Sequence, residues 1–360
     1  MLVSVAKIGR LSFVVALFSV LAIAAVGCAD DGDEAEVIVQ TVVVEKEVDK
    51  PKPKPLVVYS GRSESLVGPL ISDFEEVTGI EVQVNYGKTG ALAATLLEEG
   101  GNSPADVFFA QDPGGLGSVD SLLAELSSDI LDSVPDWAHD PENRWVGTSG
   151  RARTVVYNTD ALTEADLPDS IEDFTKPEWK GRIGWAPTNS SLHAMITAMR
   201  QEWGEDRTKA WLEGIVANDV KAYAKNTPTV AAAGAGEIEV GFVNHYYLHR
   251  FIAEEGESFA ARNYYTRTAD PGSVVLVAGT AILESSDNKD VAKQFIKFLL
   301  SASGQQYFAA KTYEFPLNEN AKPNNLLPAI EDITKPSIDL GDLKDIKGTQ
   351  ELLREVGALP

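Results

Sequence analysis

The sequence predicts an α/β protein in which two lobes, each a mostly parallel sheet flanked by helices, enclose a cleft. Two observations support this class. From Leu56 onward, apolar runs of β-forming residues alternate with amphipathic helical runs, and the alternation recurs after residue 150 with no long linker between. The length of 360 residues fits two domains of roughly 100–200 residues each.

The first half begins with a strand-helix rhythm that implies parallel strands joined by right-handed crossovers. Strands are predicted at residues 56–59, 80–86 and 107–109, and helices at 66–77 and 92–99. Ligands of such sheets bind at the carboxyl ends of strands. The loops at residues 60–64 and 111–115 are therefore expected at a binding site.

The second half repeats this pattern. Strands are predicted at residues 154–157, 183–185, 220–224, 239–243 and 274–283, and helices at 192–203, 230–235 and around 291–299. The expected division places residues 56–150 and about 275–322 in lobe 1. Lobe 2 is expected to contain residues from about 151 to 274 and from about 323 to 360.

The first 27 residues are typical of a secretory signal peptide, with Lys7 and Arg10 before an apolar run from Leu11 to Val26. The one cysteine of the chain, Cys28, follows this run and resembles the lipidation site of a bacterial lipoprotein. Residues 28–55 are acidic and then rich in proline, which favours an extended tether. We therefore expect an exported protein, anchored by lipid to the outer face of the membrane; a plain signal peptide or an uncleaved anchor is the alternative.

The composition excludes several functional classes. Lys and Arg number 31 against 54 Asp and Glu, a formal net charge of -23, which argues against a nucleic acid partner. One Cys and 4 His argue against a disulfide framework and a Cys/His zinc cluster. No phosphate-binding glycine motif and no Gly-x-Ser-x-Gly elbow occurs. Nothing in the sequence indicates an enzyme.

Two adjacent phenols, Tyr246 and Tyr247, follow the predicted strand at 239–243. Neighbouring residues of a strand point to opposite faces, so both can reach one ligand only where the strand breaks, as Asn244-His245 suggests. Phenolate oxygens suit Fe(III), and proton release would then accompany binding. The alternative is a pair of aromatic residues that line a core or cleft.

Other polar residues suit an anion. Thr188, Asn189, Ser190 and Ser191 precede a predicted helix, where free N–H groups bind anions or receive an ordinary cap. Arg151 and Arg153 can bind carbonate or phosphate in a bidentate manner, or form surface ion pairs. Asn226 either orients an anion or ends a strand.

Seven collinear segments resemble the ferric-iron-binding family of bacterial ABC-transporter solute-binding proteins. They are VVYSGR from Val57, SPADVF from Ser103, SGRAR from Ser149, WKGRIG from Trp179, YAKN from Tyr223, NHYY from Asn244 and DPG from Asp270. The resemblance covers roughly residues 56–323. It implies a periplasmic-binding-protein type II fold, in which the lobes close around the ligand.

The resemblance also implies roles for individual residues. Tyr246 and Tyr247 match the two iron-binding tyrosines of the family, and residues 188–191 match its site for a synergistic anion, carbonate or phosphate. Asn226 and Asn244 match asparagines near that anion, and Arg151 and Arg153 match a basic pair around carbonate. The usual His and Glu ligands are replaced by Ser63 and Gln111, so Glu64, Asp112, Gln111 or Ser63, or anions and water, would complete the shell.

These expectations describe the monomeric binding component of an ABC importer, which carries Fe(III) to a membrane permease and its ATPase. The alternative is the same fold with another solute: an oxyanion, thiamine or a polyamine. An exported enzyme or sensor domain is a third possibility without a supporting motif.

Overall fold

The computed structural model describes residues 53–319 and 321–360. The predicted signal peptide, Cys28 and nearly all of the predicted tether lie outside the described residues. Within the described part of the chain, no helix combines the length and the apolar character that a membrane crossing requires.

One mixed sheet runs through residues 53–360, in the strand order β2-β1-β3-β9-β4-β7-β5-β6, with β8 paired to β4. Its strands are β1 (Leu56–Ser60), β2 (Val82–Tyr86), β3 (Val107–Ala110), β4 (Val146–Asn158), β5 (Ile183–Trp185), β6 (Lys221–Ala222), β7 (Val240–Asn244), β8 (Ala261–Tyr264) and β9 (Val275–Ile282). The pairs of β1 with β2 and β3, and of β5 with β6 and β7, are parallel, as the sequence predicts.

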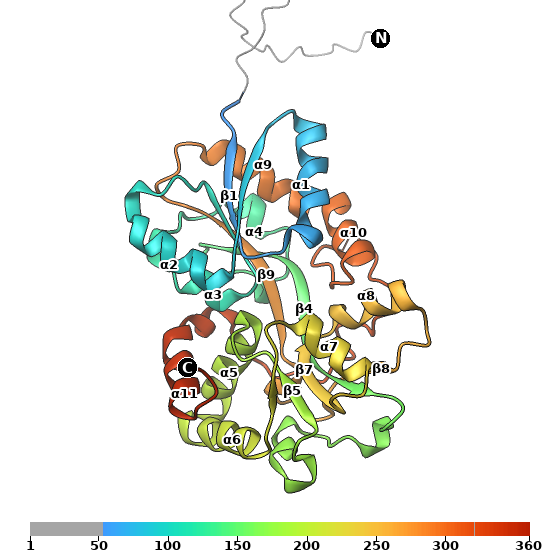
Figure 1. Cartoon of the computed structure of the whole chain (residues 1–360). Helices are drawn as coiled ribbons and strands as arrows, with labels where there is room; N and C mark the ends of the chain where they lie inside the picture. Colours follow the sequence, from blue (N-terminus) through green and yellow to red (C-terminus); the bar gives the residue numbers. More distant parts are fainter. Residues whose placement is uncertain (1–52, 320) are drawn as a thin grey trace, which may run out of the picture. The chain divides into compact units, whose positions relative to one another are not determined.

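The two long strands β4 and β9 join the halves of the sheet (Figure 1). Strand β9 is antiparallel to β3 and pairs with β4 from Val146 to Ala152. From Arg153 onward, β4 pairs instead with β7 and β8. The change of partner at residues 152 and 153 lies close to the predicted lobe boundary at residue 150, which remains a prediction.

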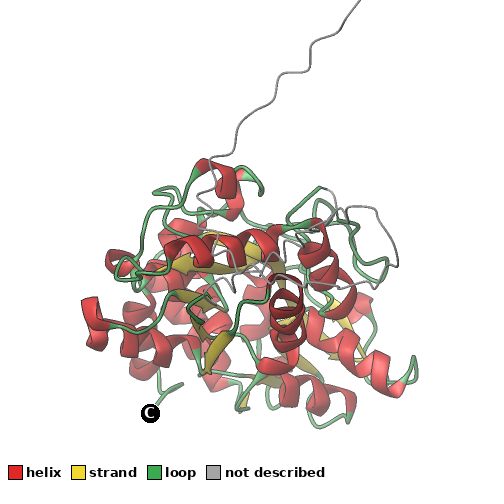
Figure 2. Cartoon of the chain, turned by 90° about the horizontal axis from the view of Figure 1, so that it is seen from above, coloured by secondary structure: helices red, strands yellow, loops and turns green. Residues whose placement is uncertain are grey.

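Helices cover the strands on both sides (Figure 2). They are α1 (Glu64–Thr78), α2 (Thr89–Glu99), α3 (Pro113–Gly117), α4 (Ser128–Leu131), α5 (Ser190–Trp203), α6 (Glu205–Ala217), α7 (Asn226–Gly234), α8 (Tyr246–Glu255), α9 (Lys289–Leu300), α10 (Ala302–Lys311) and α11 (Ile346–Glu355). Short 3-10 helices connect them, and η8 (Leu340–Lys344) directly precedes α11.

Aromatic side chains fill the core on either side of the crossing strands. Phe74 of α1 packs edge-on against Phe295 of α9 at 5.2 Å between ring centroids. In the second half, Phe242 of β7 contacts Phe174 and Trp211 at 5.4 and 5.8 Å. Edge-to-face pairs such as Phe74 with Phe295 and Phe174 with Phe242 add to the free energy of apolar burial. The first of these pairs holds α1 against α9.

Several elements begin earlier than the apolar pattern predicts. Helix α7 starts at Asn226 rather than at residue 230, and α5 starts at Ser190 rather than at 192. The first turns of these helices carry polar residues, so apolar periodicity does not reveal them. Strand β4 extends back to Val146 and is buried along its whole length, although it contains Gly, Ser and Arg.

Candidate functional site

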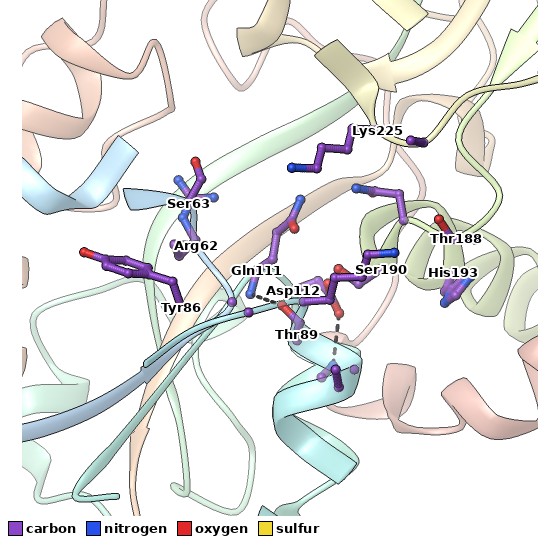
Figure 3. Close-up of a pocket in the computed structure, with 18 of the residues that line it drawn as sticks. Arg62, Ser63, Tyr86, Thr89, Gln111, Asp112, Thr188, Ser190, His193 and Lys225 are labelled. Atoms are coloured by element: carbon purple, nitrogen blue, oxygen red, sulfur yellow. Dashed lines mark hydrogen bonds between the residues drawn. The ribbon is translucent and has the colours of Figure 1, made fainter. Parts of the chain in front are cut away.

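A cavity of about 890 Å³ opens between the ends of elements from both halves of the sheet. Its wall includes the loop after β1, the loop after β3, and the residues that begin α5, α7 and α8 (Figure 3). Nine of the predicted site residues line it: Ser63, Glu64, Gln111, Asp112, Thr188, Asn189, Ser190, Tyr246 and Tyr247. The carboxyl ends of β1 and β3 therefore do meet at a site.

The tyrosine pair lies at the junction of β7 and α8. Strand β7 ends at Asn244, His245 precedes the helix, and Tyr246 is its first residue. This break lets the two rings stack on one side, with centroids 4.3 Å apart and an angle of 29° between their planes. Both rings line the cavity, as the predicted break at Asn244-His245 requires.

The two phenols differ in environment. Tyr246 is fully buried, and its hydroxyl has no hydrogen-bond partner among the described residues. Burial raises the pKa of Tyr247 well above 10, and the adjacent Tyr246 phenol raises it further, whereas Arg62 and Arg151 act in the opposite direction. Without a bound metal, Tyr247 is therefore protonated at neutral pH, so that coordination by its phenolate would release a proton.

His245 holds the junction in place. Its Nδ1 accepts a bond of 3.2 Å from the Ala152 N–H, and its Nε2 donates to the Tyr313 carbonyl at 2.8 Å. Burial lowers the pKa of this imidazole to about 3, with a smaller contribution from His249. Because both nitrogens of the neutral ring bond to backbone groups, the ring fixes the start of α8 and with it the position of the two tyrosines.

Arg151 and Arg153 stand two residues apart on β4, which directs both side chains to one face. Both are fully buried, and neither forms an ion pair with any described residue, so the surface ion pairs considered above are excluded. Arg151 donates to Ser191 Oγ at 3.3 Å, and Arg153 to Asn244 Oδ1 at 2.9 Å. Burial, and then repulsion from Arg151, lower the pKa of Arg153 to about 9, which still leaves it cationic at neutral pH.

Arg62 is a third buried guanidinium, and the sequence reasoning did not select it. It follows β1 and forms an ion pair with the buried Glu314, which also accepts from Ser149 Oγ. Burial favours a lower pKa for Arg62, but attraction to Glu314 exceeds this effect and the pKa rises. Its Nε and Nη1 have no partner among the described residues. Its position in the segment VVYSGR, directly after a predicted strand, is the sequence feature that indicates a place at the binding site.

The start of α5 connects the two halves across the cavity. Asn189 Oδ1 accepts from the Ser191 N–H at 3.0 Å and so caps the helix. Ser191 Oγ also accepts from the Gln111 side chain at 3.2 Å, although Gln111 belongs to the loop after β3. The predicted anion site and a predicted metal-site residue are thus in direct contact.

Unpaired polar atoms are frequent among the predicted site residues. Asn226 is fully buried, and within the described part of the chain neither its Oδ1 nor its Nδ2 has a partner; Asn244 Nδ2 also lacks one there. Together with the free nitrogens of Arg62, Arg151 and Arg153, these form a group made mostly of hydrogen-bond donors. Buried polar atoms rarely lack partners, so such a group is typical of a site that receives ligand oxygens.

The predicted oxygen ligands of the first half are less uniform. Ser63 and Glu64 are exposed at the start of α1, and Ser63 Oγ lies 3.4 Å from Ser65 Oγ. Asp112 is fully buried; its Oδ1 caps α3 by accepting from Gly115 N–H at 3.0 Å, and its Oδ2 has no partner among the described residues. Asp112 thus has both a structural role and a free carboxylate oxygen.

Among the described residues, no group of three or more His, Cys, Asp or Glu side chains could hold a metal ion. A metal in this cavity would therefore depend on the phenols. The cavity wall also contains side chains that the sequence reasoning did not select: Tyr86, Lys88, Thr89, His193, Lys225, Arg250, Ile346, Gln350, Arg354 and Leu359. The last four come from the C-terminal segment, whose distant position gave no sequence signal.

Known proteins are similar to this chain over most of its length. Residues 103–336 match the family model described as bacterial extracellular solute-binding protein. The major ferric iron-binding protein of Neisseria meningitidis is 34% identical over 310 residues, 84% of this chain and 92% of that protein. The Fe(3+)-binding periplasmic protein of Serratia marcescens is 33% identical over 84% of this chain and 90% of that protein.

A solved structure supports the fold. Iron-bound HitA from Pseudomonas aeruginosa superimposes with a TM-score of 0.81 at 31% identity, over 85% of this chain and 100% of that one. The relatives are solute-binding transport proteins and not enzymes, as the missing catalytic motifs suggest.

Proposed function

Because this chain belongs to the family of bacterial extracellular solute-binding proteins with a periplasmic-binding-protein fold, whose relatives bind ferric iron, we propose that it binds Fe(III) in the cavity. The observation that carries the proposal is the stacked pair Tyr246 and Tyr247, backed by three buried arginines. Phenolates supply hard anionic oxygen to the metal. The arginines supply charge for an accompanying oxyanion.

In this proposal a synergistic anion, carbonate or phosphate, occupies the group of unpaired donors. Arg151 and Arg153 would bind it from β4, and Asn226, Asn244 and the start of α5 would complete its hydrogen bonds. The anion would neutralise part of the metal charge and part of the charge of Arg151 and Arg153, which lack acidic partners in the described part of the chain. Asp112 Oδ2 is the buried carboxylate oxygen available to the metal from the other wall.

Delivery follows from the same arrangement. The loaded protein would close about β4 and β9 as a monomer and dock on an ABC-importer permease, whose ATPase drives release of the ion inward.

Cys28 would carry a lipid that anchors the protein to the outer face of the membrane. Palmitate labelling that persists in Cys28→Ala would contradict this anchor.

The iron proposal is tested by adding ferric citrate to the purified protein. We expect a visible tyrosinate-to-iron charge-transfer band, which Tyr246→Phe with Tyr247→Phe abolishes. Tyr157→Phe, a buried tyrosine that does not line the cavity, is the matched control and should leave the band intact. A band that survives the double change, or no band at all, would show the iron proposal to be wrong.

An oxyanion as the transported solute is the second candidate, and the buried arginines favour it. A protein without a charge-transfer band whose Tm rises with phosphate would support it. Thiamine and polyamines are disfavoured because they are cations, and the cavity is lined by five cationic side chains against two carboxylates.

A further inference from the structure

The wall of the cavity is cationic although the chain is strongly acidic. Four cationic side chains line it in addition to Arg62: Lys88, Lys225, Arg250 and Arg354. Sixteen ion pairs are found among the described residues, and none includes any of these four. Nor does any of the four side chains form a hydrogen bond with a described residue. In a chain with 54 acids and 31 bases, this lack of acidic partners around one cavity is informative.

These cations come from separate elements that converge on the cavity. Lys88 and Lys225 directly precede α2 and α7, one from each half of the sheet. Arg250 follows Tyr246 by one helical turn on α8, and Arg354 belongs to α11. Figure 3 shows the Lys225 side chain extending into the drawn pocket. A ligand that reaches the tyrosine pair therefore meets positively charged side chains from both halves of the sheet and from the C-terminal helix α11.

Helix termini add to the same potential. Six helices of nine residues or more begin at the cavity wall: α1, α2, α5, α7, α8 and α11. Each N-terminus carries roughly half a positive elementary charge from the aligned peptide dipoles. Glu64 and Asp112 are the acids among the lining side chains, and they are fewer than the cations. The cationic wall of the cavity would therefore repel a hydrated metal cation.

We infer that these four cations select the form in which the metal arrives, as an anionic chelate with a polycarboxylate or phosphate ligand. The inference rests on the proposed function, which it deepens by naming the substrate class. A cavity of about 890 Å³ exceeds the space of one metal ion and small anion, and it accommodates an organic chelator. Clefts lined by one sign of charge raise association rates of oppositely charged ligands by about 10- to 1,000-fold.

The test compares two ferric donors of different charge, ferric citrate as the anion and tris(acetohydroxamato)iron(III) as the neutral complex. Iron retained by the protein after gel filtration is measured against time at low ionic strength. We expect Lys88→Gln with Lys225→Gln to slow loading from the anionic donor about 10-fold. Loading from the neutral donor should change less than about twofold, because no charge is attracted. Both lysines are exposed, so neither change disturbs packing.

Two controls make the result specific. Lys322→Gln removes an exposed lysine that does not line the cavity and should load like the unaltered protein. Arg354→Gln tests a third cation independently and should also slow the anionic donor alone. High ionic strength should remove the difference between the variants, because salt screens exposed charges.

The outcomes separate the two proposals. Equal slowing of both donors, or no slowing of the anionic donor at low ionic strength, would overturn the selection by charge and leave iron binding intact. Failure of the unaltered protein to retain iron from either donor would instead overturn the proposed function.

Discussion

At the scale of single residues, buried charge distinguishes this protein. Three arginines lie in the interior near the tyrosines, and among the described residues only Arg62 has an acidic partner, Glu314. Arg151 and Arg153 donate to side-chain or backbone oxygens, but to no carboxylate in residues 53–319 and 321–360. Burying such charges is costly unless they are paired. Their persistence is understandable if a ligand supplies the missing negative charge.

Glu314→Gln tests the buried pair. The change leaves the Arg62 guanidinium without its counter-charge, so we expect the free energy of unfolding in urea to fall by about 3–5 kcal/mol. Replacing both partners, as Arg62→Met with Glu314→Leu, should recover much of this loss because no isolated charge remains.

A matched change at the surface provides the reference. Asp129→Asn removes the exposed partner of Lys297 and should change stability little, because solvent screens such pairs. If Glu314→Gln were as stable as the unaltered protein, the buried ion pair would not contribute as described.

At the scale of elements, strand-to-helix junctions place the site. The junction of β7 and α8 turns two adjacent tyrosines to one side, and the start of α5 brings Ser191 to Arg151 and Gln111. His245 connects the first junction to Ala152 on β4 and to Tyr313 beyond α10. A neutral imidazole is required there because both nitrogens are already engaged and the ring is fully buried.

The low pKa of His245 makes stability depend on pH. The folded value is about 3, against roughly 6.5 in the unfolded chain, so between these values the unfolded state binds a proton that the folded state does not. The contribution of this residue is therefore present above pH 6.5 and is lost as the pH falls. Between pH 7 and pH 5 the loss is roughly 2 kcal/mol.

Urea unfolding of the unaltered protein and of His245→Gln at pH 7 and pH 5 measures this contribution. We expect the variant to be less stable at pH 7 but to lose roughly 2 kcal/mol less on acidification. Equal losses in the two proteins would mean that His245 is protonated in the folded state.

At the scale of the whole molecule, β4 and β9 connect the two walls of the cavity. They are the long strands shared by both halves of the sheet, and Gln111 to Ser191 is a hydrogen bond between those halves. If the halves move about these strands, a ligand favours closure only as far as it binds the closed form more tightly. The C-terminal segment forms part of the wall and would move with one of them.

Small-angle scattering tests this motion. Iron with its anion should reduce the radius of gyration of the unaltered protein, because ligand contacts from both halves stabilise closure. The Tyr246→Phe, Tyr247→Phe protein should keep the larger value when iron is added. A radius that does not respond to iron in the unaltered protein would contradict hinge closure.

The sequence by itself determined the alternation of strands and helices, the polar loops after β1 and β3, and the tyrosine pair at a strand end. These features are local, because apolar periodicity and short polar breaks are written in neighbouring residues. The tertiary structure decided that Arg62, Arg151 and Arg153 are buried together, and that Glu314 and the residues of α11 belong to the same region. Burial and ion pairing join residues up to 252 positions apart, as in Arg62 and Glu314, and local patterns carry no record of such contacts.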